Sequence, residues 1–286
     1  MHRKNCERQL SNKIENRPSK KIEMVFGGGR KLGIEVLKWL CTLEWLQITA
    51  VCPVPFEFDM DFADELQKVI KENHLKSCVF EDLKGMKFDI GLSVNYHAII
   101  PDEILQICEK GFYNIHHSYN LSLRGRNITT HAILNTKKEG VYYHGTTLHK
   151  MISQLDAGPV VASTACEIDD NDTAYSLFCK VDALALQIIK EWIPRLAYQT
   201  VYPYQPPKEG IHYYKNKDLP SKEIQIDLLE GDVIYDYVRA FDFPGKEPAY
   251  VMKNGVKRNL VLHKRPGFTK KIEIKNCIYY TDSNLE

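Results

Sequence analysis

The chain has 286 residues, a formal net charge of +1, and an ordinary balance of 44% hydrophobic and 26% charged residues. A near-neutral protein has no overall field that attracts nucleic acid or an anionic membrane. No apolar run approaches the roughly 20 residues that a membrane-spanning helix needs. Its eight cysteines are scattered, with no C-x-x-C pair, which is typical of reduced thiols in the cytoplasm. We therefore expect a cytoplasmic globular protein without a nucleic-acid or membrane partner.

From residue 21 to about residue 200, apolar runs alternate with patterns of helical spacing. Residues 1–20 come first and form a polar arm that lacks the apolar centre of a secretory signal. Strands are then predicted at 22–26, 46–54, 88–94, 111–116, 140–149 and 160–168. Helices are predicted at 32–40, 62–71, 101–109, 128–134 and 173–196. This alternation predicts an α/β fold with a Rossmann-like, doubly wound, mostly parallel sheet, whose ligands bind outside the carboxyl ends of the strands.

A proline-rich segment at 202–207 interrupts regular structure and predicts a boundary. The residues that follow, 211–278, read as short strands and turns. We therefore expect an arm at 1–20, a catalytic domain at 21–200 and a small β-rich C-terminal subdomain at 201–286.

An amide, an imidazole and a carboxylate recur near the ends of predicted strands. Asn114 and His116 alternate on one strand, an H-G-x-T segment follows at 144–147, and Asp156 begins a D-x-G loop. An amide can hold a carbonyl oxygen, an imidazole can move a proton, and a carboxylate can orient the imidazole. Any one of these residues alone would be read as a satisfied structural side chain. Together they indicate a site for acyl transfer to an amine.

These motifs, with the R-G-R-N loop at 124–127, resemble the folate-dependent formyltransferases over residues 27–196. The surrounding residues resemble the branch that formylates nucleotide-linked amino sugars. The resemblance implies that His116 transfers the proton, Asn114 donates to the oxyanion and Asp156 holds His116. It also implies 10-formyltetrahydrofolate as co-substrate, a nucleotide-linked amino-dideoxy sugar as acceptor, and a homodimer. A dTDP-linked 3- or 4-amino sugar is the first expectation, and UDP- or CMP-linked sugars remain open.

The same resemblance implies two sets of binding residues. The folate set is Ser93, Tyr96, Ile99, Ile100 and Gly158. The acceptor set is Gly28, Gly29, Arg30, Ser118, Arg124, Arg126, Asn127 and His144. The structural alternative for the glycine turn is close helix packing, and for the arginine loop it is a solvated surface. No G-x-G-x-x-G pattern supports a dinucleotide site instead.

This chain departs from the family pattern just after the catalytic strand. Many relatives carry proline at the position of His117, and a Leu-Pro pair where this chain has Asn120 and Leu121. His117 is expected on the opposite side of the strand from His116 and so cannot share its task. These changes alter the loop after the catalytic strand but leave the three candidate catalytic residues intact.

The sequence also raises the question of a metal site and leaves three other functions open. Pairs of histidines suggest a metal, but there is no H-E-x-x-H or paired-cysteine set, so we expect no metal site. A methionyl-tRNA formyltransferase should carry a longer, basic C-terminal domain. A hydrolase would release formate with water as acceptor. A folate or nucleotide-sugar sensor would have lost turnover.

Overall fold

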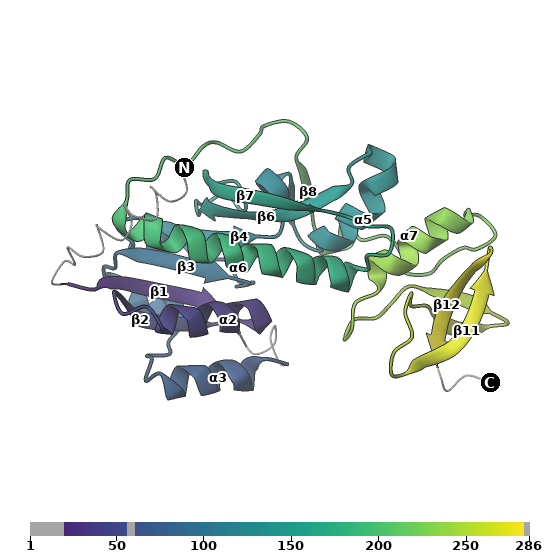
Figure 1. Ribbon diagram of the computed structural model, residues 1–286, viewed down its shortest axis with the longest axis horizontal. Helices are drawn as coiled ribbons and strands as arrows, with labels where there is room; N and C mark the ends of the chain where they lie inside the picture. Colours follow the sequence, from purple (N-terminus) through teal and green to yellow (C-terminus); the bar gives the residue numbers. More distant parts are fainter. Residues whose placement is uncertain (1–19, 56–60, 283–286) are drawn as a thin grey trace, which may run out of the picture. The chain divides into compact units, whose positions relative to one another are not determined.

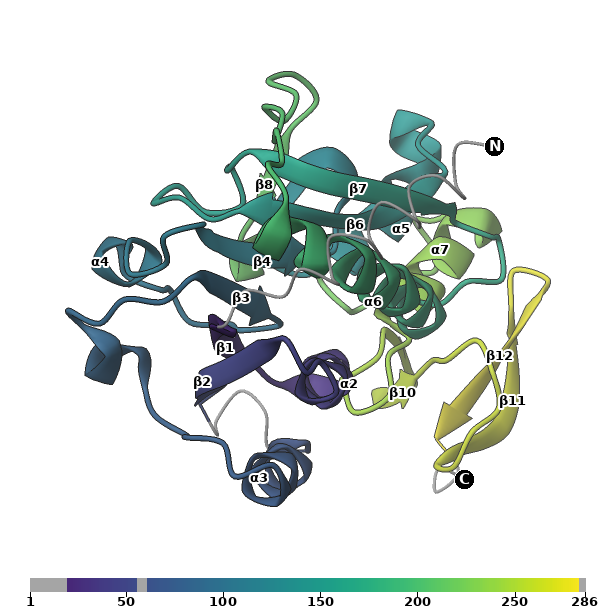
Figure 2. The ribbon, with the colours of Figure 1, turned by 60° about the vertical axis from the view of Figure 1, so that its left-hand side comes forward.

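The computed structural model describes residues 20–55 and 61–282, so the predicted N-terminal arm lies almost entirely outside the described residues. Six strands are hydrogen-bonded in the order β2-β1-β3-β4-β6-β7. Their bounds are Ile22–Gly28 (β1), Leu46–Pro53 (β2), Ile90–Val94 (β3), Phe112–His116 (β4), Tyr143–Lys150 (β6) and Val160–Glu167 (β7). Strand β1 pairs in parallel with both β2 and β3, whereas β6 and β7 are antiparallel and lie side by side in Figure 2. The predicted α/β class with a mostly parallel sheet is confirmed.

The chain divides into two compact units, and the boundary falls inside β4, between Asn114 and Ile115. Unit 1 holds the residues up to 114, together with 150–153 and 193–201. Unit 2 holds residues 115–149 and 154–192, and those from 202 onward. The division predicted from the proline-rich break, at 200/201, stays a prediction.

In unit 1, two amphipathic helices lie side by side beside the first two strands (Figure 1). They are α2 (Arg30–Cys41) and α3 (Ala63–Glu72), linked by a 2.7 Å ion pair between Lys38 and Glu65. The apolar residues that recur every three or four positions along α2 are all buried. The helical spacing read from the sequence is therefore the spacing that buries one face.

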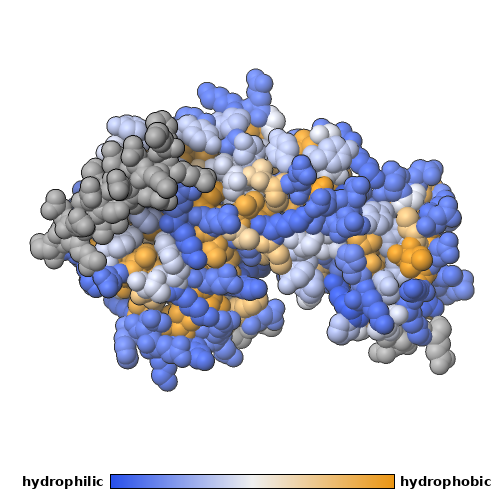
Figure 3. Space-filling view, in the orientation of Figure 1, coloured by the Kyte–Doolittle hydropathy of each residue, from blue (hydrophilic) through white to orange (hydrophobic). Residues whose placement is uncertain are grey.

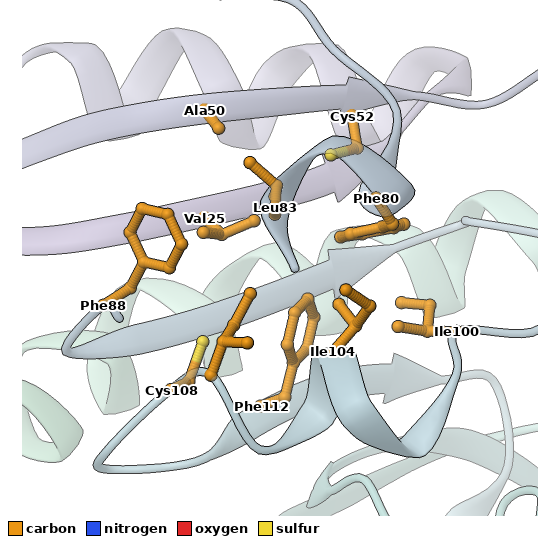
Figure 4. Packing of buried hydrophobic residues seen from close by; sticks show 11 residues of the cluster. Val25, Ala50, Cys52, Phe80, Leu83, Phe88, Ile100, Ile104, Cys108 and Phe112 are labelled. Carbon is orange, nitrogen blue, oxygen red and sulfur yellow. The ribbon is translucent and has the colours of Figure 1, made fainter. Parts of the chain in front are cut away.

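The core of unit 1 includes a cluster formed by strands β1, β2 and β4 and two short helices. Figure 4 shows Val25, Leu83, Ile104 and Phe112 directed into this layer. Leu83 comes from the 3-10 helix η2 (Phe80–Leu83), and Ile104 from α4 (Asp102–Leu105). The helix predicted at 101–109 is therefore too long. It ends early because the main chain of Phe88 pairs with Ile107 and Glu109 as an isolated bridge.

Unit 2 contains α5 (Ile128–Glu139) and most of the long helix α6 (Ala174–Tyr198), whose apolar pattern was clear in the sequence. A short strand, β5 (Leu123–Gly125), pairs in parallel with β8 (His212–Tyr214). Gly125 has a φ of +92°, and a Cβ there would lie 2.1 Å from the carbonyl oxygen of Tyr214. Only glycine permits this approach of the two strands.

The C-terminal part of unit 2 forms two hairpins, β9 (Tyr250–Lys253) with β10 (Val256–Asn259) and β11 (Phe268–Ile274) with β12 (Cys277–Asp282). They confirm the predicted β-rich appendage. The sequence prediction missed α7 (Gly231–Phe241), which lies between α5 and the β11–β12 hairpin in Figure 1. Ile234 and Val238 of α7 join Tyr279 in one buried cluster. The spacing of Ile234 and Val238, four positions apart, was the signal in the sequence that indicated this helix.

The face of the molecule shown in Figure 3 is mostly hydrophilic, and its apolar side chains are exposed in small groups. Among residues 20–55 and 61–282, no helix combines the length and the apolar character needed to cross a membrane.

Candidate active site

His116 is the last residue of β4, and both nitrogens of its ring face protein groups. Nε2 lies 2.8 Å from the carbonyl oxygen of Leu123, and Nδ1 lies 3.5 Å from Oδ1 of Asp156. A carbonyl oxygen only accepts, so the hydrogen of this contact sits on Nε2. The longer contact leaves Nδ1 facing a carboxylate. The His116 and Asp156 side chains are 12% and 9% exposed, so the pair lies in a largely dry environment.

Asp156 is held by its own loop and by β5. Its φ of 49° is in the left-handed region, which aspartate tolerates better than most residues. Its Oδ2 accepts the main-chain N–H of Gly125 at 3.2 Å. Arg124 is nearby and buried; burial lowers the pKa of its guanidinium, and the charge of Asp156 opposes that shift. The carboxylate is therefore oriented before any ligand binds.

Asn114 is two residues before His116 on β4, so both side chains are on the same face of the strand. Both are half-buried, whereas Ile115 between them is buried. The structure thus places the predicted amide and imidazole on one strand face and brings the imidazole to the predicted carboxylate.

The main chain around His116 is anchored by β6. Thr146 donates its hydroxyl to the carbonyl oxygen of His116 at 3.1 Å, and Thr147 donates to that of Ser118 at 2.6 Å. The hydroxyl of Ser118 accepts the N–H of Leu123 at 2.8 Å. Ser118, predicted to contact the acceptor, is fully buried. Its hydroxyl and carbonyl oxygens are bonded to Leu123 and Thr147.

Two groups that the sequence reasoning missed also hold the site. They are the carbonyl oxygen of Leu123 and the N–H of Gly125. Main-chain groups leave no residue-type signal. Only the H-G-x-T motif, which supplies both threonines, pointed towards this support.

His144, also predicted to contact the acceptor, lies inside β6 and is only 2% exposed. Its Nε2 is 3.4 Å from the hydroxyl of Thr129. Burial first, and then the charges of His117 and His116, lower the pKa of His144 to about 3. The ring is therefore neutral near pH 7, and it is buried within β6 instead of being exposed to an acceptor.

The arginine loop is split between interior and surface. Arg124 is buried and donates from Nε to the carbonyl oxygen of Leu121 at 3.0 Å. Arg126 and Asn127 are exposed, and the main-chain N–H of Arg126 donates to Tyr214 of β8 at 2.9 Å. Of this loop, only Arg126 and Asn127 are on the surface.

The glycine turn of unit 1 serves close packing. A Cβ at Gly28 would lie 2.7 Å from the carbonyl oxygen of Val94. The N–H of Gly29 already donates to that same oxygen at 3.3 Å. Arg30 follows with a φ of 54° and is half-buried. This arrangement agrees with the structural alternative for the glycines.

The predicted folate residues differ widely in exposure. Ser93 and Ile100 are buried, whereas Ile99 is 83% exposed. Tyr96 packs edge-on against Phe80, with ring centroids 5.0 Å apart, and burial raises its pKa to about 12. In unit 2, Gly158 is buried in the loop after Asp156. Only part of this set is on the surface.

Within the described residues, no group of three or more His, Cys, Asp or Glu side chains is arranged to hold a metal ion. Residues 61–193 match a protein-family model described as Formyl transferase, and this stretch includes all three candidate catalytic residues. This stretch of the chain is therefore similar to the formyl transferase family.

Among curated proteins, the chain is 29% identical to a methionyl-tRNA formyltransferase from Mycoplasma capricolum. That match spans 187 residues, 60% of this chain and 57% of the relative. The chain thus covers little more than half of the relative's length.

Solved structures of formyltransferases share the fold of this chain. A 4-N formyltransferase from Francisella tularensis has a TM-score of 0.69 and 20% identity, over 85% of this chain and 98% of that one. An N-formyltransferase from Helicobacter canadensis, solved with folinic acid and dTDP-3-aminofucose, has a TM-score of 0.71 and 19% identity, over 91% and 98% of the two chains. WlaRD, a sugar 3N-formyl transferase solved with dTDP and 5-N-formyl-THF, has a TM-score of 0.72 and 20% identity, over 94% and 100%.

Proposed function

We propose that this protein is an N-formyltransferase that moves the formyl group of 10-formyltetrahydrofolate to the amine of a nucleotide-linked amino-dideoxy sugar. The observation that carries the proposal is the contact of His116 with Asp156, beside Asn114 on the same strand face, in a stretch that matches the formyl transferase model. We also propose that it acts in the cytoplasm as a homodimer.

In this reaction the amine nitrogen bonds to the formyl carbon, and the bond from that carbon to the folate nitrogen breaks. His116 takes the proton that the amine loses, through the ring nitrogen that faces Asp156. The charge of Asp156 then stabilises the imidazolium ring. The amide of Asn114 donates to the oxygen that becomes negative, and one such donor contributes about 3 kcal/mol at a transition state. The proton returns to the departing folate nitrogen.

The acceptor class is supported by the surface chemistry and the structural neighbours. Arg126 is exposed beside β5, and a guanidinium binds phosphate oxygens in a fork. Two neighbours of the same fold were solved with dTDP or a dTDP-linked amino sugar. We therefore propose a dTDP-linked 3- or 4-amino sugar first, and UDP- or CMP-linked sugars after it.

For the folate, the loop after β3 in unit 1 offers suitable groups. The Nδ2 atom of Asn95 is buried without a hydrogen-bond partner, and Ile99 is exposed a few residues later. A pterin ring needs main-chain and amide partners together with apolar contact, which fits these residues. We propose that these residues of unit 1 hold the pterin end of the folate.

A second candidate follows from the curated relative, which is named a methionyl-tRNA formyltransferase. Recognition of tRNA needs many phosphate contacts from basic residues. The near-zero net charge of this chain makes it the weaker candidate.

The test is formyl transfer from 10-formyltetrahydrofolate to a panel of dTDP-, UDP- and CMP-linked amino sugars, with methionyl-tRNA as a further acceptor. We expect transfer to one class of sugar, its loss in His116→Ala, and a loss of about 10²–10³-fold in kcat in Asn114→Ala. His263→Ala, at an exposed histidine of the C-terminal part, is the matched control and should keep full activity. Formylation of the tRNA alone, or formate release without an acceptor, would overturn the proposal. Sedimentation of the pure protein tests the homodimer.

A further inference from the structure

His117, which follows the candidate catalytic histidine, has its own carboxylate partner. Its Nε2 lies 3.1 Å from Oδ1 of Asp182 on α6, a close electrostatic contact that lacks hydrogen-bond geometry, and its side chain is 9% exposed. Its ring also packs edge-to-face with that of Phe178, with centroids 4.9 Å apart. Phe178 and Asp182 are four positions apart on α6, so they are neighbours on one face of the helix. This face of α6 therefore contacts the His117 imidazole through one aromatic ring and one carboxylate.

His116 and His117 therefore belong to separate His–Asp pairs. His116 pairs with Asp156 of the loop before β7, and His117 pairs with Asp182 of α6. Each imidazole thus faces a carboxylate of its own. A third imidazole near both rings, His144 of β6, has its pKa lowered to about 3 by burial and by the two neighbouring rings, and stays neutral.

The second pair acts on the first through the main chain. Residue 117 is bonded directly to residue 116, so an anchor on the His117 side chain limits rotation of the backbone that carries the His116 ring. The β6 threonines hold the carbonyl oxygens of residues 116 and 118. Residue 117, which lies between them, is contacted by α6 instead. Loss of that anchor should let the His116 ring move away from the Leu123 carbonyl oxygen, which lies 2.8 Å from its Nε2.

We propose that His117 is a positioning residue: its pairing with Asp182 holds the end of β4 on α6 and thereby keeps the His116 ring at Leu123 and Asp156. His117 itself touches neither substrate nor the reacting atoms. The kinetic part of this inference rests on the proposed formyl transfer, whereas the positional part does not.

The test uses the full chain with His117→Leu, which removes the partner of Asp182, and His117→Gln, which keeps a nitrogen donor near the same place. Asp182→Asn is the second route, in case His117→Leu does not fold. His263→Leu, at an exposed histidine, is the control. The first readout is the rate at which diethyl pyrocarbonate modifies His116, followed by peptide mass spectrometry well below each variant's unfolding temperature.

We expect His116 to be modified about tenfold faster in His117→Leu, since the opened population of the ring sets the rate. His117→Gln and His263→Leu should match the wild type. In formyl transfer, His117→Leu should lose about 10- to 100-fold in kcat, because a small misplacement of a reacting group has an effect of that size. KM for either substrate should stay within about twofold, as for loss of a transition-state interaction.

An unchanged rate of His116 modification in both His117→Leu and Asp182→Asn overturns the positioning role, whatever happens to kcat. Equal loss in His117→Gln and His117→Leu would also overturn it, since the retained donor would then have no effect. If the wild type formylates no acceptor, the proposed function fails. The modification rates still decide the positioning role in that case.

Discussion

The main-chain N–H of Gly125 donates to Oδ2 of Asp156 at 3.2 Å, while Oδ1 of the same carboxylate lies 3.5 Å from the His116 ring. A glycine of the arginine loop thus orients the carboxylate that faces the candidate catalytic imidazole. The same glycine lies against β8, where a Cβ would be 2.1 Å from the Tyr214 oxygen. Packing of β5 on β8 and orientation of Asp156 therefore depend on one position.

Gly125→Ala should damage both packing and activity. The φ of +92° is unfavourable for alanine, and the new Cβ collides with a main-chain oxygen that cannot move without shifting β8. We expect a loss of at least about 3 kcal/mol in the free energy of unfolding, measured by urea titration, and a lower kcat. Gly210→Ala is the matched control, since Gly210 has a φ of +67° but nothing within 4 Å of a built Cβ. It should lose only about 1–2 kcal/mol. Equal losses at the two glycines would contradict the packing argument.

Asp156→Asn keeps the size of the side chain and an oxygen for the Gly125 N–H, but removes the charge that faces His116. We expect kcat for formyl transfer to fall by about 10²–10⁴-fold with little change in KM, the range found for loss of acid–base catalysis. Steady-state kinetics against the accepted sugar measure this. Asp170→Asn, at an exposed aspartate of the loop before α6, should leave kcat unchanged. A wild-type kcat in Asp156→Asn would remove Asp156 from the mechanism.

Stability should decrease in mild acid because of His144. Its pKa is lowered from an ordinary 6.5 to about 3 in the folded protein, so the unfolded chain binds the extra proton first as pH falls. The stabilising contribution is complete above about pH 6.5 and is lost as pH falls towards 3. The slope for one proton is at most about 1.4 kcal/mol per pH unit.

Urea unfolding at pH 7, 6 and 5 should therefore show a steeper loss of stability in the wild type than in His144→Gln. His263→Gln, at an exposed site, should follow the wild type. Parallel curves for the wild type and His144→Gln would show that His144 takes up its proton equally in the folded and unfolded chains.

Arg239 of α7 should be essential for folding of the C-terminal part. It is 2% exposed and bonds to Asp236 at 2.7 Å and to the carbonyl oxygen of Asp169 at 2.9 Å. Arg239→Met leaves a buried carboxylate and a main-chain oxygen without this donor, so we expect a loss of about 3–5 kcal/mol in the free energy of unfolding. Lys222→Met breaks the 3.1 Å pair with Glu247, which is half exposed, and should lose less than about 1 kcal/mol. A small effect of Arg239→Met in chemical denaturation would contradict this role.

The sequence by itself determined the α/β class and most element bounds, because burial of one helix face or of a whole strand requires a regular apolar spacing. It also proposed Asn114, His116 and Asp156 as catalytic residues, because their order resembles that in the folate-dependent formyltransferases. It failed at two helices. The helix predicted at 101–109 is cut short by strand-like pairing of Phe88, and α7 was missed although its buried residues have helical spacing.

Tertiary structure alone decided which side chains of the motifs face the site and which face the interior. Ser118, Arg124 and His144 sit in the right motifs yet are buried, since loops and strands from distant parts of the chain cover them. The partners of His116 and His117 come from residues 7 to about 65 positions away, and two of the groups that hold the site belong to the main chain. No local pattern encodes such distances, because they depend on how separate segments pack. For the same physical reason, the sequence could not show that His117 contacts Asp182. Only the packing of α6 brings the two side chains together.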